Sequence, residues 1–132
     1  MPFTFVWHDE SKTALRYQAE GDWNWKDYHT CVRGSLFTLH GHDQQVDSII
    51  DLRGSTRTTM PSGLPAHIRT FGKRSHPNLT GRAVVIGLPD YGFESLHMSS
   101  DQSIATSDGV IRFVESEDAL HALLMEWQQN NL

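Results

Sequence analysis

The segment around Ser62 combines residue types from which chemistry could be built. A serine hydroxyl can act as a nucleophile beside a base, or it can carry a phosphate. His67 and His76 follow along the chain and are the bases that a nucleophilic Ser62 would need. The nucleophile-elbow pattern G-x-S-x-G is absent, so an enzyme of unknown type is the weakest interpretation. We predict no catalytic residues.

The eight histidines of the chain do not follow a metal-binding pattern. No HExxH sequence is present, and His40 and His42 flank Gly41 in a predicted loop, where two imidazoles would need a third ligand from elsewhere. The single cysteine, Cys31, cannot form an internal disulfide or a thiolate set for zinc. A glycine-rich phosphate loop is also missing. We therefore expect no metal and no cofactor.

Charge and composition argue against several classes of function. The 132 residues hold 11 Lys and Arg against 16 Asp and Glu, a formal net charge of -5. Such a balance opposes attraction to phosphate backbones, so we expect no nucleic-acid partner. No stretch reaches the ~20 apolar residues of a membrane span, and the beginning MPFTFVWHDE lacks the pattern of a secretory leader. Together with the lone cysteine, these features predict a cytoplasmic protein without membrane insertion.

Hydrophobic periodicity indicates which elements position Ser62. Residues 3–7 and 13–20 alternate between large apolar and smaller or polar side chains, which predicts an antiparallel hairpin. Asn24 stands ahead of Asp27 in an arrangement close to a capping box, and it predicts the start of a helix that ends near Gly41. The apolar stripe of this helix comprises Trp25, Tyr28, Val32, Leu36 and Leu39.

Short runs rich in β-branched residues, 46–52, 83–87 and 110–114, predict buried strands. After the first of these runs, Ser62 is predicted to be the N-cap of a second helix, because Pro65 suits a first helical turn. The apolar face of that helix comprises Leu64, Ile68 and Phe71. Ser116 is predicted to cap a C-terminal helix.

The order of these elements predicts one α/β domain over residues 1–132. Alternating strands and helices after an opening hairpin imply an open sheet of about five strands, mostly parallel after the hairpin and covered by about four helices. Apolar anchors are sparse between residues 88 and 109, where the sequence is compatible with a short helix or with a mobile loop.

Ser62 is thus expected where a buried strand leads into a helix. Helix N-termini present unpaired amide donors and the positive end of the dipole, which favours a phosphate there. Arg53, Arg57 and Arg69 are near enough in sequence to pair with it. A phosphate would add roughly two negative charges to an exposed rim and would repel a docked partner. The alternative is that Ser62 only caps the helix, which is worth about 1 kcal/mol.

Two segments resemble the STAS family, which includes bacterial anti-sigma-factor antagonists and the tails of sulphate transporters: Ile50-Asp51-Leu52 and Ser62-Gly63-Leu64. The resemblance implies a STAS-like domain with Ser62 at the position that partner kinases phosphorylate. The chain also looks like small bacterial STAS-like proteins that begin with a Trp-bearing strand. That likeness rests on the segments 21–25, 61–63, 75–79 and 113–119.

We therefore predict a non-enzymatic regulatory module that binds a protein, such as a regulatory kinase or a signalling protein, and that Ser62 phosphorylation controls. The predicted binding residues are Arg53, Ser55, Thr56, Arg57, Pro61, Gly63, Leu64 and Arg69. An alternative is a domain that binds a lipid, a nucleotide or another anion through Arg53, Ser55, Thr56, Ser62, Tyr91 and Phe93. A homodimer through the hairpin face, at Phe3, Phe5, Trp7 or Trp23, stays open.

Overall fold

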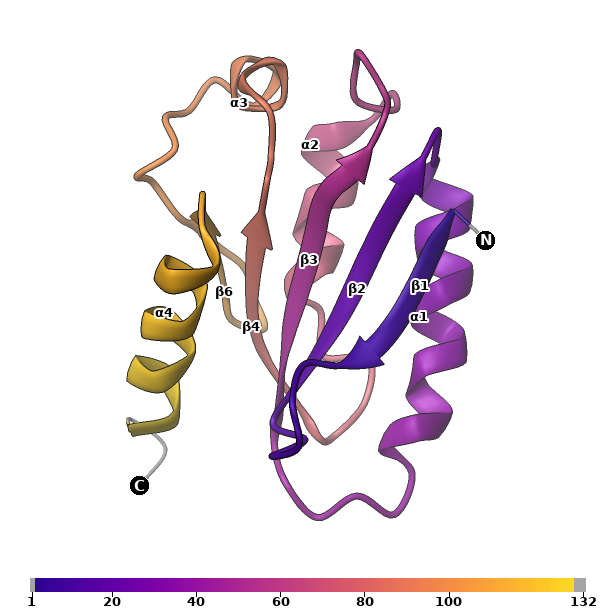
Figure 1. The fold of residues 1–132 in the computed structure, drawn as a ribbon, viewed down its shortest axis with the longest axis vertical. Helices are drawn as coiled ribbons and strands as arrows, with labels where there is room; N and C mark the ends of the chain where they lie inside the picture. The colour runs from indigo at the N-terminus through magenta and orange to yellow at the C-terminus, as the bar shows by residue number, and fades with distance from the viewer. Residues whose placement is uncertain (1, 130–132) are drawn as a thin grey trace.

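The structure of the protein is a computed structural model and describes residues 2–129. Its centre is a six-stranded sheet in the order β1-β2-β3-β4-β6-β5 (Figure 1). The strands are β1 (Phe3–Trp7), β2 (Ala14–Gly21), β3 (Val46–Ser55), β4 (Leu79–Ile86), β5 (Ile104–Ala105) and β6 (Val110–Val114). This arrangement confirms the predicted α/β fold with an opening hairpin.

Strand direction places the loops of interest at one edge of the sheet. β1 is antiparallel to β2, whereas β2, β3, β4 and β6 run parallel to one another. The two-residue strand β5 adds an antiparallel edge beyond the predicted strands. The carboxyl ends of the four parallel strands therefore meet at the upper edge in Figure 1, beside α2 and α3. This is where ligands and partners meet open α/β sheets.

The helices α1 and α4 begin where the sequence supplies side-chain caps. They are α1 (Trp25–Leu39), α2 (Leu64–His67), the 3-10 helix η1 (Ile68–Gly72), α3 (Asp90–Leu96) and α4 (Glu117–Gln129). The predicted capping box is present, because Asp27 N donates to Asn24 Oδ1 at 2.9 Å and Asn24 N donates to Asp27 Oδ2 at 3.0 Å. Ser116 Oγ accepts from Ala119 N and caps α4 as predicted.

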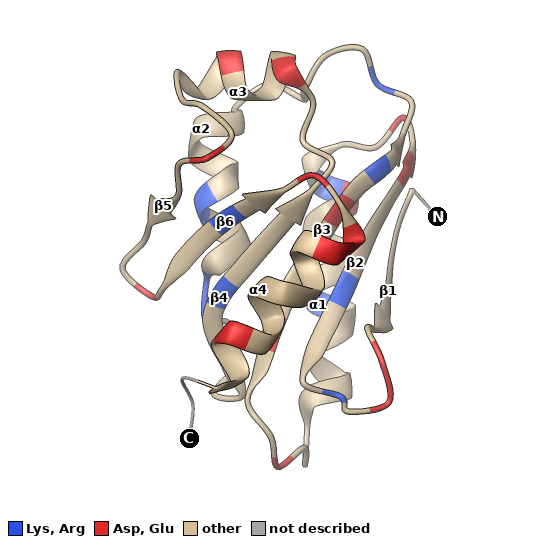
Figure 2. Ribbon diagram, turned by 60° about the vertical axis from the view of Figure 1, so that its left-hand side comes forward, with Lys and Arg blue, Asp and Glu red and all other residues tan. Residues whose placement is uncertain are grey.

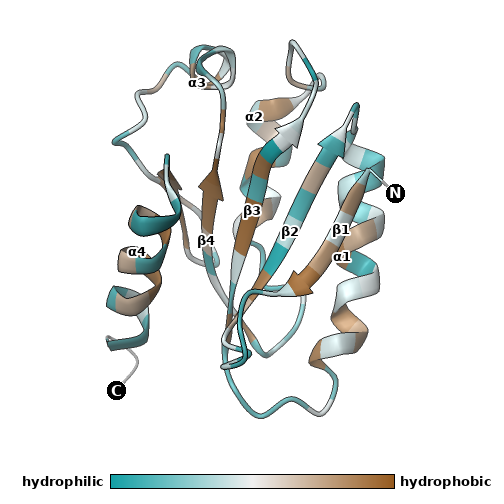
Figure 3. Ribbon diagram, viewed as in Figure 1, coloured by the Kyte–Doolittle hydropathy of each residue, from teal (hydrophilic) through white to brown (hydrophobic). Residues whose placement is uncertain are grey.

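The helices cover the two faces of the sheet unequally. Side chains of α1, α2 and η1 join the larger core cluster on one face, where Tyr28, Leu64 and Phe71 are buried. On the other face, α4 packs Leu120, Leu124 and its neighbours against β3 and β4 (Figure 2). The hydrophobic residues of the sheet concentrate in those two central strands (Figure 3). The sheet thus lies between two apolar layers, each specified by a helical stripe.

The predicted N-cap of the second helix was wrong. The N-cap of α2 is Gly63, not Ser62, because Gly63 takes a left-handed conformation with φ of 87° and no side-chain cap bond forms. Of the residues considered for a homodimer, Phe3 and Trp23 are buried in the core of the chain itself, whereas Phe5 and Trp7 are partly buried. Segment 88–109 contains the short helix α3 together with β5. Within residues 2–129, no helix is long and apolar enough to cross a membrane.

Candidate functional site

The loop that joins β3 to α2 is held in place through its backbone carbonyls. The indole Nε1–H of Trp25, on α1, donates to Ser62 O at 2.9 Å and to Pro61 O at 3.3 Å. From α3, the hydroxyl of Tyr91 donates to Arg57 O at 2.8 Å. Donors from two helices therefore fix this loop, which we call the Ser62 loop (residues 56–63).

A second set of contacts anchors the beginning of the Ser62 loop. Arg57 bonds to Asp22 Oδ1 at 2.8 Å, to Trp23 O at 2.9 Å and to Thr59 O at 2.8 Å. The indole of Trp23 donates to Ser55 Oγ at 3.0 Å. Arg57 and Ser55 were both predicted to bind a partner. In the structure, their side chains are instead bonded within the chain, to Asp22, Trp23 and Thr59.

Ser62 differs from its neighbours in having an unused side chain. Ser62 is exposed, and its hydroxyl makes no hydrogen bond to any of residues 2–129. Gly63 beside it is exposed too and takes the left-handed turn that begins α2. Pro61 and Leu64, which flank this pair, are buried. The loop therefore presents a short exposed tip between two anchored residues.

The remaining predicted binding residues are scattered around that tip. Thr56 is exposed, and its backbone N donates to Gly21 O. Arg69 is exposed on η1 and donates to Ala105 O at 3.5 Å. His76 belongs to the segment before β4, at the opposite edge of the sheet, where its Nδ1 accepts from Asn78 N. The structure does not bring His76 to Ser62, so that pairing gives no catalytic site.

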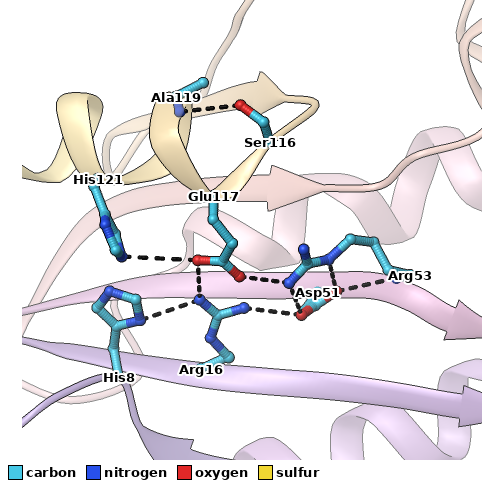
Figure 4. Close-up of polar contacts among 8 residues, drawn as sticks. All are labelled: His8, Arg16, Asp51, Arg53, Ser116, Glu117, Ala119 and His121. Carbon is cyan, nitrogen blue, oxygen red and sulfur yellow. Dashed lines mark hydrogen bonds and ion pairs between the residues drawn. The ribbon is translucent and has the colours of Figure 1, made fainter.

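Arg53 points away from the Ser62 loop, toward α4. It donates from Nε and Nη2 to Asp51 and reaches Glu117 at the start of α4 (Figure 4). Arg16, from β2, bonds to the same two carboxylates, to Asp51 at 2.8 Å and to Glu117 at 3.0 Å. We call these residues, Arg16, Asp51, Arg53 and Glu117, the charge cluster.

Both carboxylates of the charge cluster are stabilised in the ionised form. Burial opposes ionisation of Asp51, but hydrogen bonds from Arg53 and Arg16 outweigh it and hold the pKa of Asp51 below its usual range. Hydrogen bonds from Arg16 and Arg53 likewise lower the pKa of Glu117. The contact with Asp51 raises the pKa of Arg53. Two guanidinium groups thus neutralise two carboxylates, and the cluster leaves no spare charge for a ligand.

Two histidines border the charge cluster. His8 Nδ1 lies 3.2 Å from Arg16 Nη2, and His121 Nε2 lies 3.7 Å from Glu117 Oε2 (Figure 4). Burial and then the charge of Arg16 lower the pKa of His8. His8 is therefore neutral at neutral pH, a state that suits a neighbour of a guanidinium group.

A different pair of histidines lies beside the Ser62 loop. His29 Nε2, on α1, is 3.1 Å from His67 Nδ1, on α2. The His67 ring stacks on the Trp25 indole with a centroid separation of 4.7 Å and an interplanar angle of 9°. His67 thus contacts the side chain that holds the loop, and its Nδ1 faces His29.

Several of these residues were missed in the sequence. Arg16 and Asp51 interrupt apolar strands, and a charge at such a position signals a buried partner. Glu117 follows the predicted cap Ser116, but its sequence position does not show that it is the partner from α4. His29 had no signal, because its contact with His67 joins residues 38 positions apart. Pairing of this kind depends on the packing of the two helices.

The arrangement offers little for catalysis or for a bound metal. Among residues 2–129, no three His, Cys, Asp or Glu side chains gather as a metal site requires. Burial raises the pKa of Cys31 to about 11, so this thiol is not a nucleophile at neutral pH. Arg53 lines a hollow of about 370 Å³ with Gln18 and Gly54, but Ser55, Thr56 and Ser62 do not line it. This hollow therefore does not bring the predicted ligand-binding residues together.

Comparisons with protein-family models, with curated proteins and with solved structures found no match to this chain.

Proposed function

We propose that the chain is a non-enzymatic interaction module of STAS type that binds a regulatory protein through the Ser62 loop and α2. The observation that carries the proposal is the contrast within the loop. Carbonyl oxygens of Arg57, Pro61 and Ser62 accept bonds from other elements, whereas the Ser62 hydroxyl is exposed and unbonded within residues 2–129. The STAS type rests on the sequence resemblance, and the α/β order of strands and helices supports the proposal.

A loop anchored in this way is suited to recognition. Ordering a mobile loop costs roughly 0.5–1.5 kcal/mol for each immobilised side chain, and this cost is reduced when the loop is fixed before binding. Indole donors supply the anchoring from the core side, because Trp23 and Trp25 are both buried. The tip at Ser62 and Gly63 therefore meets a partner in a defined conformation.

Phosphorylation of Ser62 is the control that we propose for this surface. A phosphate would place about two negative charges on the exposed tip at neutral pH. Arg57 is bonded to Asp22 and to two carbonyls, so it is not a ready partner for that phosphate. The added charge would face outward, where it repels an acidic partner surface and removes a close neutral contact.

Affinity capture with the whole chain tests the proposal. Immobilised wild type, Ser62→Asp and Ser75→Asp are exposed to a lysate of the source organism, and captured proteins are quantified by mass spectrometry. Ser75 is an exposed serine at the opposite edge of the sheet and is the matched control. We expect at least one protein that wild type and Ser75→Asp retain and that Ser62→Asp loses. Identical capture by all three would refute the proposed surface.

Mass spectrometry of the protein purified from its source tests the proposed control. Phosphate on Ser62 is the expected modification. A Ser62 that stays unmodified under all growth conditions, together with normal capture by Ser62→Asp, would remove the phosphorylation step.

A further inference from the structure

The His29–His67 pair connects the Ser62 loop to α1 through a chain of three contacts. His29 Nε2 and His67 Nδ1 are 3.1 Å apart, within hydrogen-bond distance. The His67 ring lies flat against the Trp25 indole. That indole donates to Ser62 O at 2.9 Å. A change in the histidine pair therefore acts on the side chain that holds the loop.

An N–H···N bond between two imidazoles depends on their protonation. It needs one donor and one acceptor, which two neutral rings provide. One added proton preserves the bond, since the charged ring donates and the neutral ring accepts. A second proton turns both facing nitrogens into donors, and the two cations then repel each other. The contact between His29 and His67 is lost only at this second step.

The surroundings of His29 oppose its protonation. Burial lowers the pKa of His29, and the charges of His67, Arg33 and Lys73 lower it further. Arg33 lies on α1 and Lys73 follows η1, and no carboxylate is among the charges that act on His29 within residues 2–129. His67 instead stacks on an indole face, which attracts a cation. The surroundings of His29 therefore favour its neutral form, in which the contact with His67 is kept.

We propose that His29 and His67 form a pH-responsive latch on the Ser62 loop, closed while His29 is neutral and released when both rings are protonated. The inference rests on the proposed function in one respect, namely that the Ser62 loop is the docking surface. Acidification would then weaken partner binding by releasing His67 from α1, with no change in the charge cluster on the opposite face of the sheet.

Nuclear magnetic resonance of the full chain tests the latch without any partner. The probe is the indole N–H resonance of Trp25, assigned with Trp25→Phe, as the pH is lowered from about 8 to about 5. We expect this resonance to move in two steps. In His29→Gln the amide oxygen can still accept from His67 but cannot be protonated, so a single step remains. His40→Gln, at an exposed histidine, is the control and keeps both steps.

The outcomes separate the latch from the docking surface. A Trp25 resonance that does not move, or that moves identically in wild type and His29→Gln, overturns the latch even if capture depends on Ser62. Should His29→Gln fail to fold, His67→Asn replaces it, and a single step is then expected; two steps in this variant overturn the latch. Two steps in wild type with capture unaffected by Ser62→Asp would keep the latch and reject the docking surface.

Discussion

At the carboxyl end of β3, the polar groups on the two sides of the sheet are held by different kinds of contact. On the α4 side, Asp51 and Glu117 are bound to Arg16 and Arg53, so the charged groups are used within the molecule. On the α2 side, the Ser62 loop is held by neutral indole and phenol donors that bind its carbonyls. The charges of the cluster are therefore used within the molecule, whereas the exposed Ser62 hydroxyl is the group that we propose for partner binding.

The charge cluster is expected to dominate stability because its central pair is buried. The side chains of Arg16 and Asp51 are each 9% exposed. Such a pair stabilises the fold little more than apolar residues of the same volume would, but removal of Asp51 leaves the buried guanidinium of Arg16 sharing the single carboxylate of Glu117 with Arg53. Asp51→Asn is therefore predicted to lower the free energy of unfolding by about 3 kcal/mol.

Urea denaturation measures this first and largest effect. The control is Asp22→Asn, whose ion pair with Arg57 has a carboxylate that is 84% exposed. We expect this control to cost less than about 1 kcal/mol. Equal losses in the two variants would mean that burial does not distinguish the two ion pairs, and the structural role of the cluster would be rejected.

The pH dependence of the melting temperature provides a second test of the charge cluster. Because the folded-state pKa values of Asp51 and Glu117 are depressed, their stabilisation is present above the unfolded value of about 4 and is lost as the pH falls through the folded values. The melting temperature of wild type should therefore fall steeply below about pH 4. Asp51→Asn should fall less steeply, since one of the two contributions is gone.

Asp47, on the same strand, provides a control of opposite sign. Burial raises its pKa despite bonds from Thr80 and Arg82, so its protonation stabilises the folded state as the pH falls. Asp47→Asn removes this compensation and should make the acid-induced drop in melting temperature steeper than in wild type. If Asp51→Asn and Asp47→Asn change the pH dependence of the melting temperature in the same direction, the explanation by shifted pKa values is wrong.

The anchoring of the Ser62 loop is expected to be worth less than the charge cluster. Trp25→Phe keeps a large ring but removes the indole donor to Pro61 and Ser62. We predict a loss of about 2 kcal/mol in the free energy of unfolding, because the carbonyl oxygens of Pro61 and Ser62 lose their donor and the smaller phenyl ring packs less well than the indole. Limited proteolysis should cut the Ser62 loop faster in this variant than in wild type. Unchanged cleavage would show that the indole does not hold the loop.

The sequence predicted those elements whose stabilising contacts join residues close together in the chain. The capping box of Asn24 and Asp27 lies within one turn of helix, so its residues specify it without help from the rest of the fold. The predicted strand 83–87 began late because β4 starts at Leu79, where Thr80 and Arg82 face Asp47 and break the apolar run. Tertiary partners made that polar stretch part of a strand.

The candidate site was predicted less completely than the fold. An exposed Ser62 beside a helix start was anticipated, but its assignment as N-cap failed because Gly63 supplies the left-handed turn. The partners that fix the loop, Trp25 and Tyr91, are 37 and 34 positions from the carbonyls they bind. Contacts over such distances arise from packing between helices, which residue spacing along the chain does not encode.

Ser62→Asp is expected to have the smallest effect on stability. The residue is exposed and its hydroxyl is unbonded within residues 2–129, so the free energy of unfolding should change by less than about 0.5 kcal/mol. Differential scanning calorimetry checks this value. A loss of more than about 1 kcal/mol would indicate a structural role for Ser62 and would weaken the use of this variant as a probe of docking.

Hydrogen–deuterium exchange of the protein with and without its captured partner tests the central claim most directly, because it reports which side of the sheet the partner covers. We predict slower exchange in the Ser62 loop and α2, and unchanged exchange in α4. Protection confined to α4 and the strands that carry the charge cluster would contradict the assignment of the docking surface to the Ser62 loop.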